Sequence, residues 1–220
     1  MPPIGALAIG YLAGSIPFAY LAGRLLQGID LRTVGSGNLG ATNVYRTLGA
    51  PAAVVVLLLD ALKGALPVLL LPAEVTHLRP GIGSLQLLTL GIGVTAILGH
   101  AKPIFLLWKG GGKGVATTAG VFAALAPTAL AIVLGLFAFI LWRTRIVSVA
   151  SIGAALGLPW AVLMTIGPAS PLVAVSIFVA LFVLWTHRAN LARIKAGTEP
   201  RIGKPGSAAL AAASTKKGDR

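Results

Sequence analysis

Long apolar segments alternate with short polar ones along this chain. A transmembrane helix needs about 20 predominantly apolar residues. The apolar segments cover residues 4–26, 51–72, 81–99, 115–142, 146–166 and 172–186. The fourth is long for one helix and short for two, but Pro127 lies near its middle, where a proline would break a helix. The pattern therefore predicts an all-α integral membrane protein with seven transmembrane helices.

Composition supports a multi-span membrane protein and excludes a soluble domain with one anchor. Hydrophobic residues make up 56% of the chain and charged residues 10%, and the mean hydropathy is +0.91, whereas a soluble domain carries about 25% charged residues. Cysteine is absent, which excludes disulfides and thiol chemistry, and the few histidines cannot build a zinc site. We expect no metal and no cofactor. We expect one membrane domain over residues 1–205 and a disordered basic tail over 206–220.

The distribution of basic residues orients the chain. There are 18 Lys and Arg residues against five acidic ones, for a net charge of +13. Basic residues concentrate in cytoplasmic loops, and the segments 27–50, 100–114 and 143–145 and the tail after residue 187 are all basic. An even number of helices must therefore separate each neighbouring pair of these segments. Because one predicted helix precedes the first basic segment, the N-terminus lies outside, and the basic tail places the C-terminus in the cytoplasm. The positive charge also suits anionic lipids and anionic substrates, and we expect no nucleic-acid partner.

The polar residues of the first basic segment are candidate ligands for phosphate. Ser36, Asn38, Thr42 and Asn43 alternate with small residues, and Arg46 closes the run. A guanidinium can bind phosphate with two parallel hydrogen bonds. The alternative is ordinary Asn/Gly turn chemistry with one arginine that follows the positive-inside rule.

A glycine-rich loop leads into the fourth apolar segment. Lys109 is followed by Gly110, Gly111 and Gly112, and then by Lys113 and Gly114. Glycine has no Cβ, so the backbone N–H groups of such a loop can approach an oxyanion, and a following helix N-terminus adds its dipole. The loop is not a Walker A motif, because no Ser or Thr follows Lys113. The alternative is a flexible linker with incidental lysines.

Several further polar residues lie in or beside the apolar segments. Asp60 and Lys63 are three residues apart within the second segment and are expected to form an ion pair. His100 precedes the glycine loop and is more simply explained as a cap or interfacial residue than as a catalyst. Ser148 and Ser151 share a helical face, as packing serines also do in membranes.

The segment after the last apolar stretch carries another polar face. His187 and Asn190 fall on one side of a predicted helix, with Arg188 elsewhere, and Arg193 and Glu199 follow. A basic segment after a last span is routine, but a face that carries His and Asn is not.

In this order the polar patterns resemble the motifs of one family. They are Ser-x-Asn-x-Gly-x-Thr-Asn-x-x-Arg, then Gly-His-x-x-Pro and the Lys-Gly-rich loop ending in Val-Ala-Thr, then His-Arg-x-Asn-x-x-Arg with Gly-x-Glu. The chain resembles the bacterial acyl-phosphate:glycerol-3-phosphate acyltransferase family, PlsY, over roughly residues 10–200. One departure is the third glycine of the loop, where the family usually has two.

The resemblance and the residue chemistry together assign roles. The residues expected to act in catalysis are Ser36, Arg46, His187 and Asn190. Those expected to bind substrate phosphate are Asn38, Thr42, Asn43, Lys109, Gly110, Gly111, Gly112, Lys113, Gly114, Ser148 and Ser151. Those expected to support the site are Asp60, Lys63, His100, Arg188, Arg193 and Glu199.

The resemblance implies transfer of an acyl group from acyl phosphate to the 1-hydroxyl of glycerol 3-phosphate, which yields lysophosphatidate and phosphate, the first step of phospholipid synthesis. It implies a bacterial inner-membrane enzyme with its site at the cytoplasmic face, and a peripheral enzyme that makes acyl phosphate as a further partner. The leaving phosphate is already a good leaving group, so we expect direct transfer without an acyl-enzyme. The proton acceptor, either phosphate or a residue such as His187, stays open.

Other classes of protein fit the sequence less well. An anion or phosphate-ester transporter would suit the intramembrane Asp60 and Lys63, but it predicts polar residues at the bilayer midplane in several helices related by a repeat. The polar groups of this chain gather at one face instead. A purely structural membrane subunit would leave the polar motifs unexplained.

Overall fold

The computed structural model describes residues 1–75 and 82–203, and over those residues it contains helices and no strand. His77, Arg79 and the predicted tail 206–220 lie outside the described residues. The α-helices are α1 Pro3–Ser15, α2 Phe18–Gln27, α3 Ala41–Leu48, α4 Ala50–Leu70, α5 Ile82–Ala101, α6 Val115–Leu125, α7 Pro127–Thr144, α8 Val147–Ile166, α9 Leu172–Thr186 and α10 Arg188–Lys195. Two 3-10 helices, η1 Leu71–Glu74 and η2 Ile104–Leu106, follow α4 and α5.

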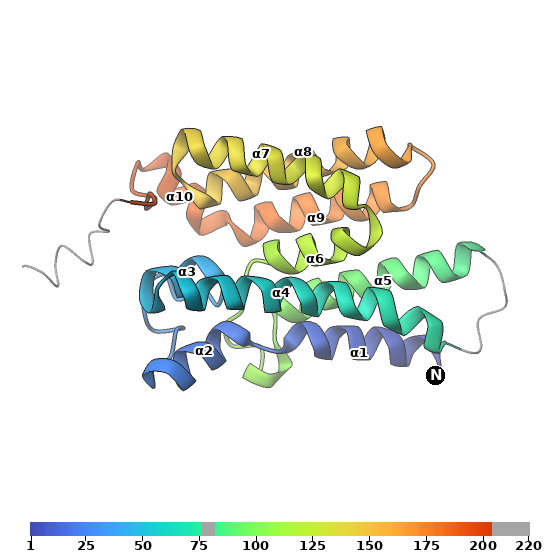
Figure 1. Cartoon of the computed structure of the whole chain (residues 1–220), viewed down its shortest axis with the longest axis horizontal. Coiled ribbons are helices and arrows are strands. Elements are labelled where there is room, and N and C mark those ends of the chain that lie inside the picture. Colours follow the sequence, from blue (N-terminus) through green and yellow to red (C-terminus); the bar gives the residue numbers. More distant parts are fainter. Residues whose placement is uncertain (76–81, 204–220) are drawn as a thin grey trace, which may run out of the picture.

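The helices form two groups that lie side by side (Figure 1). α1, α4, α5 and α6 pack on one another, and α7, α8 and α9 form the second group. Small residues allow the close approaches within the first group. A Cβ on Gly64 of α4 would strike the backbone of Thr117 in α6, and one on Gly120 would strike the backbone of Ala61. Such small-residue contacts are usual between membrane helices. Lipid tails are as apolar as the side chains, so the hydrophobic effect does not drive helices together and close packing has to.

Five helical segments are long and apolar enough to cross a membrane, and α9 with α10 makes a sixth if that pair, bent by 58°, is counted as one span. The prediction of a helix break near Pro127 is confirmed, because α6 ends at Leu125 and α7 begins at Pro127. α6 has only 11 residues, or about 16 Å at 1.5 Å per residue, so it is shorter than a full bilayer crossing. The structure therefore supports a helical membrane protein with five or six candidate spans by length and composition, and the seventh crossing, over α6, stays a prediction.

The first predicted span is interrupted rather than a continuous helix. Ile16 and Pro17 separate α1 from α2, since the proline has no N–H to donate and cannot continue the helix. The carbonyl oxygen of Ile16 is satisfied instead by Lys63 Nζ at 2.7 Å. A charged side chain of α4 thus stabilises a break in another helix.

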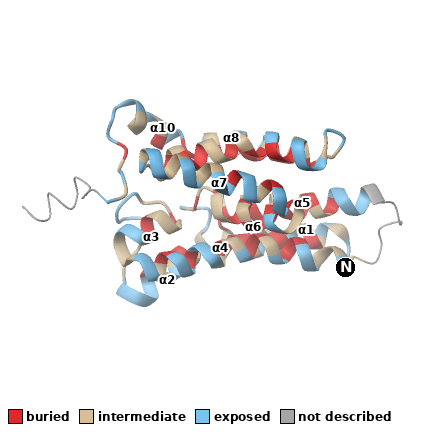
Figure 2. Ribbon diagram, turned by 45° about the horizontal axis from the view of Figure 1, so that its top comes forward, coloured by how far each residue is buried: buried red, intermediate tan, exposed pale blue. Residues whose placement is uncertain are grey.

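Exposure is consistent with a lipid environment. Buried residues lie where helices face one another, and the outer faces of the helices are exposed (Figure 2). Large apolar and aromatic side chains are exposed on α7 and α8, among them Phe139, Trp142 and Trp160. In water such a surface would aggregate, whereas in a bilayer it is the expected contact with acyl chains.

Candidate active site

The polar segments converge at one end of the helical bundle, opposite the N-terminus (Figure 1). The first loop meets the glycine loop through the N–H of Leu39, which donates to the carbonyl oxygen of Gly111 at 3.1 Å. The glycine loop is fixed to the end of α5, because the N–H of Gly112 donates to the carbonyl oxygen of His100 at 3.1 Å. Segments about 70 residues apart therefore form one surface.

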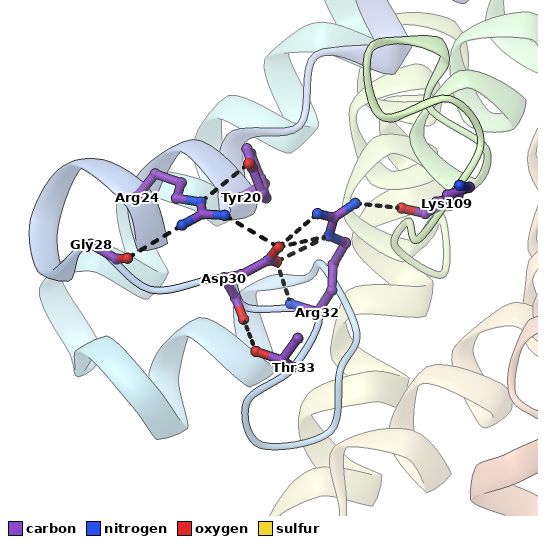
Figure 3. Close-up of polar contacts among 7 residues, drawn as sticks. All are labelled: Tyr20, Arg24, Gly28, Asp30, Arg32, Thr33 and Lys109. Atoms are coloured by element: carbon purple, nitrogen blue, oxygen red, sulfur yellow. Dashed lines mark hydrogen bonds and ion pairs between the residues drawn. The ribbon is translucent and has the colours of Figure 1, made fainter.

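A second link between the two loops was not predicted from the sequence. Arg32 is paired with Asp30 through Nη2 and Oδ2 at 2.6 Å, and its Nη1 donates to the carbonyl oxygen of Lys109 at 3.3 Å (Figure 3). Arg24 approaches the same carboxylate at 3.5 Å, and both guanidinium groups lie over the ring of Tyr20. The hydrogen bonds from Arg32 lower the pKa of Asp30 to about 2. The presence of one of only five acidic residues in a basic loop was the available signal for this cluster.

Asn43 shapes the first loop from within. Its side chain is 1% exposed. The amide nitrogen donates to the carbonyl oxygens of Leu31 at 3.2 Å and Val34 at 3.0 Å, and Oδ1 accepts from the N–H of Ser36 at 2.9 Å. All of these partners are backbone groups, so the side chain that the sequence assigned to phosphate binding is engaged in holding the loop.

The other candidate residues of the first loop are more accessible. The side chain of Ser36 is exposed, and Asn38 and Thr42 are partly exposed. Arg46, near the end of α3, is also exposed, and its charge acts on Lys113. These four residues remain available to a ligand at this end of the bundle, unlike Asn43.

The glycine loop needs glycine for both conformation and space. Gly110 and Gly114 have φ values of 93° and 81°, in the region that side chains with a Cβ avoid. A Cβ on Gly111 would strike the backbone of Ala101, and one on Gly112 would strike the imidazole of His100. The sequence explained these glycines by access of the backbone to phosphate, and the structure adds a packing reason that does not depend on a ligand.

The two lysines of the loop differ. The Lys109 side chain is exposed, and its backbone carbonyl takes part in the link to Arg32. Lys113 is partly buried, and its Nζ donates a hydrogen bond to Oδ1 of Asn190 in α10. Its backbone carbonyl accepts from the hydroxyl of Thr186 at 3.3 Å. Lys113 therefore joins the glycine loop to the last two helices.

Glu199 is the centre of a hydrogen-bond cluster at the C-terminal side of the site. Oε1 accepts from the hydroxyl of Ser148 at 2.7 Å and from the Asn190 amide at 2.5 Å, and Oε2 accepts from Arg193 Nε at 2.7 Å. Residues of α8, α10 and the segment after α10 thereby meet. Ser151, one turn beyond Ser148 on α8, is buried as well.

His187 and Arg188 occupy the bend between α9 and α10, and their side chains differ in burial and in contacts. His187 is 2% exposed, and its Nδ1 lies 2.8 Å from the carbonyl oxygen of Val183. A carbonyl only accepts, so Nδ1 carries the proton, and in the neutral ring the Nε2 lone pair can accept from another partner. Arg188 lies over the exposed ring of Trp185 and donates to the carbonyl oxygen of that residue.

A separate buried charge cluster lies beneath the glycine loop. Lys63 Nζ and Asp60 Oδ1 are 2.7 Å apart, which confirms the predicted ion pair. His100 Nδ1 lies 3.5 Å from the same carboxylate. A cavity of about 10 Å³, close to the size of one water molecule, lies among these three residues, the α1–α2 break and Gly111. This cluster supports the loop from below.

Burial, neighbouring charges and hydrogen bonds together set the pKa values of the two central titratable groups, Lys113 and Glu199. Burial lowers the pKa of Lys113 to about 8, although the charge of Glu199 raises it and the charges of Arg193 and Arg46 lower it further. Burial alone would raise the pKa of Glu199, but hydrogen bonds from Asn190, Ser148 and Arg193 hold it below its usual value. The carboxylate is therefore ionised at neutral pH, and Lys113 is mostly an ammonium that lies near its titration range.

Comparison with known proteins assigns a family to this arrangement. The family model described as glycerol-3-phosphate acyltransferase matches residues 4–197. A protein named glycerol-3-phosphate acyltransferase from Synechococcus sp. (strain CC9902) is 52% identical over 91% of this chain and 95% of its own length. One from Geotalea daltonii is 43% identical over 88% and 94%.

Solved structures agree with the sequence comparison. The crystal structure of PlsY, an integral membrane glycerol 3-phosphate acyltransferase, in its glycerol 3-phosphate form matches with a TM-score of 0.82 and 34% identity, over 91% of this chain and 96% of that one. The lysophosphatidic acid form matches with a TM-score of 0.80 and 33% identity, over 91% and 95%. The family match includes the first two polar motifs and the third as far as Gly197, and on these grounds the chain belongs to the PlsY family of glycerol-3-phosphate acyltransferases.

Proposed function

We propose that this protein transfers a fatty acyl group from acyl phosphate to the 1-hydroxyl of glycerol 3-phosphate, giving lysophosphatidate and inorganic phosphate. The observation that carries the proposal is the family match over residues 4–197, which includes every candidate site residue except Glu199. Both substrates carry a phosphate, and the converging loops supply Lys113, Arg46 and backbone amides, which are phosphate-binding groups.

The chemical step is a direct displacement. The 1-hydroxyl oxygen of glycerol 3-phosphate bonds to the acyl carbon, and the bond from that carbon to the phosphate oxygen breaks. The hydroxyl proton goes to the leaving phosphate or to Nε2 of His187. Cationic groups and amide donors that stabilise the developing negative charge do most for such a step, and Lys113 and Arg46 are the cations we assign to this task.

Ser36 and Asn190 position the reacting groups in this proposal. Ser36 is exposed in the first loop, where its hydroxyl can bond to a substrate phosphate or to the reacting hydroxyl. Asn190 orients Lys113. Asn43, whose amide bonds only to backbone, is assigned to loop structure instead of phosphate binding.

We further propose how the enzyme sits in the membrane. The described parts of the predicted basic segments lie at the same end of the bundle as the candidate site (Figure 1), which supports a cytoplasmic site, an external N-terminus and a cytoplasmic C-terminus. With the short α6 and with α9 counted as crossings, the chain has seven spans in a single membrane domain over residues 1–205, in a bacterial inner membrane. A peripheral enzyme that supplies acyl phosphate is the expected cytoplasmic partner.

Purified protein in detergent or vesicles tests the activity. With palmitoyl phosphate as donor, phosphate release should require glycerol 3-phosphate, and lysophosphatidate should appear in equal amount by mass spectrometry. Lys113→Met should reduce both products, while Lys195→Met, a change of an exposed lysine on α10, should not. Phosphate release that does not depend on glycerol 3-phosphate, or uptake of glycerol 3-phosphate into vesicles without lysophosphatidate, would contradict the proposal and favour hydrolysis or transport.

A further inference from the structure

The amide of Asn190 can satisfy both of its neighbours in only one orientation. An ionised carboxylate only accepts hydrogen bonds and an ammonium only donates them, whereas an amide has one end of each kind. The nitrogen of Asn190 therefore must face Glu199, at 2.5 Å, and Oδ1 must face Lys113. Chemistry fixes the assignment of the amide, although its nitrogen and oxygen are otherwise easily confused.

Glu199 is itself held firmly enough to impose this orientation. It is 9% exposed and accepts from Ser148 as well as Asn190 through Oε1, while Arg193 binds Oε2. The chain around it is also tied down, because the N–H of Ile202 donates to the carbonyl oxygen of Arg145 at 2.8 Å. We call residues 196–203 the C-terminal strap.

The charges around Lys113 are mostly unfavourable to an ammonium. Arg46 of α3 and Arg193 of α10 both oppose its charge, and Glu199 is the acid that favours it. His187, at the end of α9, is close enough to feel the charge of Lys113 and would add repulsion if it were protonated. A partly buried lysine with two arginines nearby needs a counter-charge to remain an ammonium.

We infer that Glu199 is a positioning residue, which fixes Asn190 so that its oxygen faces Lys113 and whose negative charge keeps Lys113 an ammonium able to bind substrate phosphate. The inference rests on the proposed function, because it assumes that Lys113 binds phosphate. A merely structural role for Glu199 predicts a lower stability of the fold when it is replaced. The positioning role predicts in addition a change in the pH range over which the enzyme works.

The pH dependence of kcat/KM for glycerol 3-phosphate separates the two roles, because it reports groups that titrate in the free enzyme. With the pKa of Lys113 at about 8, the wild-type value should fall as the pH rises through that region. Glu199→Gln keeps a hydrogen-bond acceptor but removes the charge, so the decline of kcat/KM should shift to lower pH. Arg193→Gln removes a repelling charge, so the decline of kcat/KM should shift to higher pH. Roughly one pH unit in each direction is expected for one charge at an effective dielectric constant near 20.

Two further variants serve as controls, with uncatalysed hydrolysis of the donor subtracted at each pH. Glu199→Asp keeps the charge, so the pH at which kcat/KM declines should stay near that of the wild type even where kcat drops. Thr198→Ala changes the same strap without changing charge, so this pH should not change. Thermal unfolding in detergent identifies any variant that does not fold. If Glu199→Gln is lost in this way, an unmoved profile in Arg193→Gln or a profile moved to lower pH in Glu199→Asp would still overturn the inference.

Opposite shifts for Glu199→Gln and Arg193→Gln would support the inference, because general damage to the fold cannot move the profile in both directions. Unmoved profiles in folded, active variants, or shifts of the same sign, would overturn it and leave Glu199 a purely structural residue. A wild-type enzyme with no glycerol 3-phosphate-dependent transfer would instead refute the proposed function. The two failures are therefore distinguishable.

Discussion

Asn43 holds the conformation of the loop that carries Ser36. Three backbone groups depend on its amide, and one of them, the carbonyl of Leu31, belongs to a fully buried residue. Since loop backbone groups that lose their partners must find water or remain unpaired, the loop that carries Ser36 should lose its shape without Asn43.

Asn43→Ala should therefore lower both stability and activity. We expect a cost of about 1–3 kcal/mol for the buried carbonyl left without a partner, seen as a reduced unfolding temperature in detergent. Thr47→Ala, on the same helix, removes a hydroxyl that bonds to a helical carbonyl and should cost much less. A stable Asn43→Ala variant with a raised KM for glycerol 3-phosphate alone would show that Asn43 contacts substrate after all.

Ser36 should act by a hydrogen bond and not as a nucleophile. Among the described residues no hydrogen bond joins the Ser36 hydroxyl to a histidine, whereas activation of a serine usually requires one. Ser36→Ala should slow transfer by about 1.5–3 kcal/mol, the value of a hydrogen bond to a charged group, or roughly ten- to more than a hundred-fold. Thr33→Ala, which changes a nearby hydroxyl that bonds to Asp30, is the matched control.

The kinetics of the wild-type enzyme test for a covalent intermediate. Kinetics should be sequential, with no burst of phosphate when acyl phosphate is added alone. Ping-pong kinetics, or a labelled acyl group trapped on Ser36, would refute direct transfer.

At the scale of the element, the glycine loop is held between α5 and the first loop. Its glycines fit against Ala101 and His100, and its carbonyls accept bonds from Leu39 and Arg32. Loop position is thus coupled to the buried Asp60–Lys63–His100 cluster below, which connects two polar features that the sequence presented separately.

Gly112→Ala should raise the KM for glycerol 3-phosphate more than it lowers kcat. The added Cβ strikes the His100 ring, so the loop must move and its amides no longer meet the phosphate in the same place. Loss of binding common to ground state and transition state appears in KM. Gly135→Ala, on α7 with no atom near the added Cβ, should leave KM unchanged. An unchanged KM in Gly112→Ala would favour a linker role for the loop.

The Asp30–Arg32 pair should stabilise the first loop in a pH-dependent way. Because the pKa of Asp30 is lowered from 3.8 to about 2, its contribution is fully present above pH 3.8 and is lost as the pH falls towards 2. Asp30→Asn should lower the unfolding temperature at pH 6, and this difference from the wild type should shrink as the pH falls from 4 to 2. A difference that does not change with pH would mean that the charge of Asp30 is unimportant.

At the scale of the whole molecule, the uncharged turn over 167–171 and the basic candidate site lie at opposite ends of the helical bundle (Figure 1). The strap lies at the site itself (Figure 1). If the site is cytoplasmic, these two ends face opposite sides of the membrane.

Cysteine labelling in intact cells tests this orientation, because the natural chain has no cysteine. Ala169→Cys, at an exposed residue of the 167–171 turn, should react with a membrane-impermeant maleimide from outside. Arg201→Cys, also exposed but on the strap, should react only after the cells are opened. The reverse pattern would invert the proposed topology.

The amino-acid sequence by itself determined where the apolar helices lie, which polar segments share one end, and which family the chain belongs to. These properties are local: hydrophobic length, charge bias and motif residues are each contained in short stretches, and the membrane acts on each stretch separately. The ion pair of Asp60 with Lys63 and the break before Pro127 were predictable for the same reason, since both involve residues within one turn.

Only the tertiary structure decided what each polar side chain contacts. Ser148 and Glu199 are 51 residues apart and Arg32 and Lys109 are 77 apart, and no local pattern specifies such pairs. Asn43 has the same amide whether it binds phosphate or loop backbone, and Gly112 is the same glycine whether it admits a ligand or the His100 ring. The choice depends on which groups the packed helices bring within hydrogen-bonding distance, because a polar group removed from water must bond to whatever partner the fold places beside it.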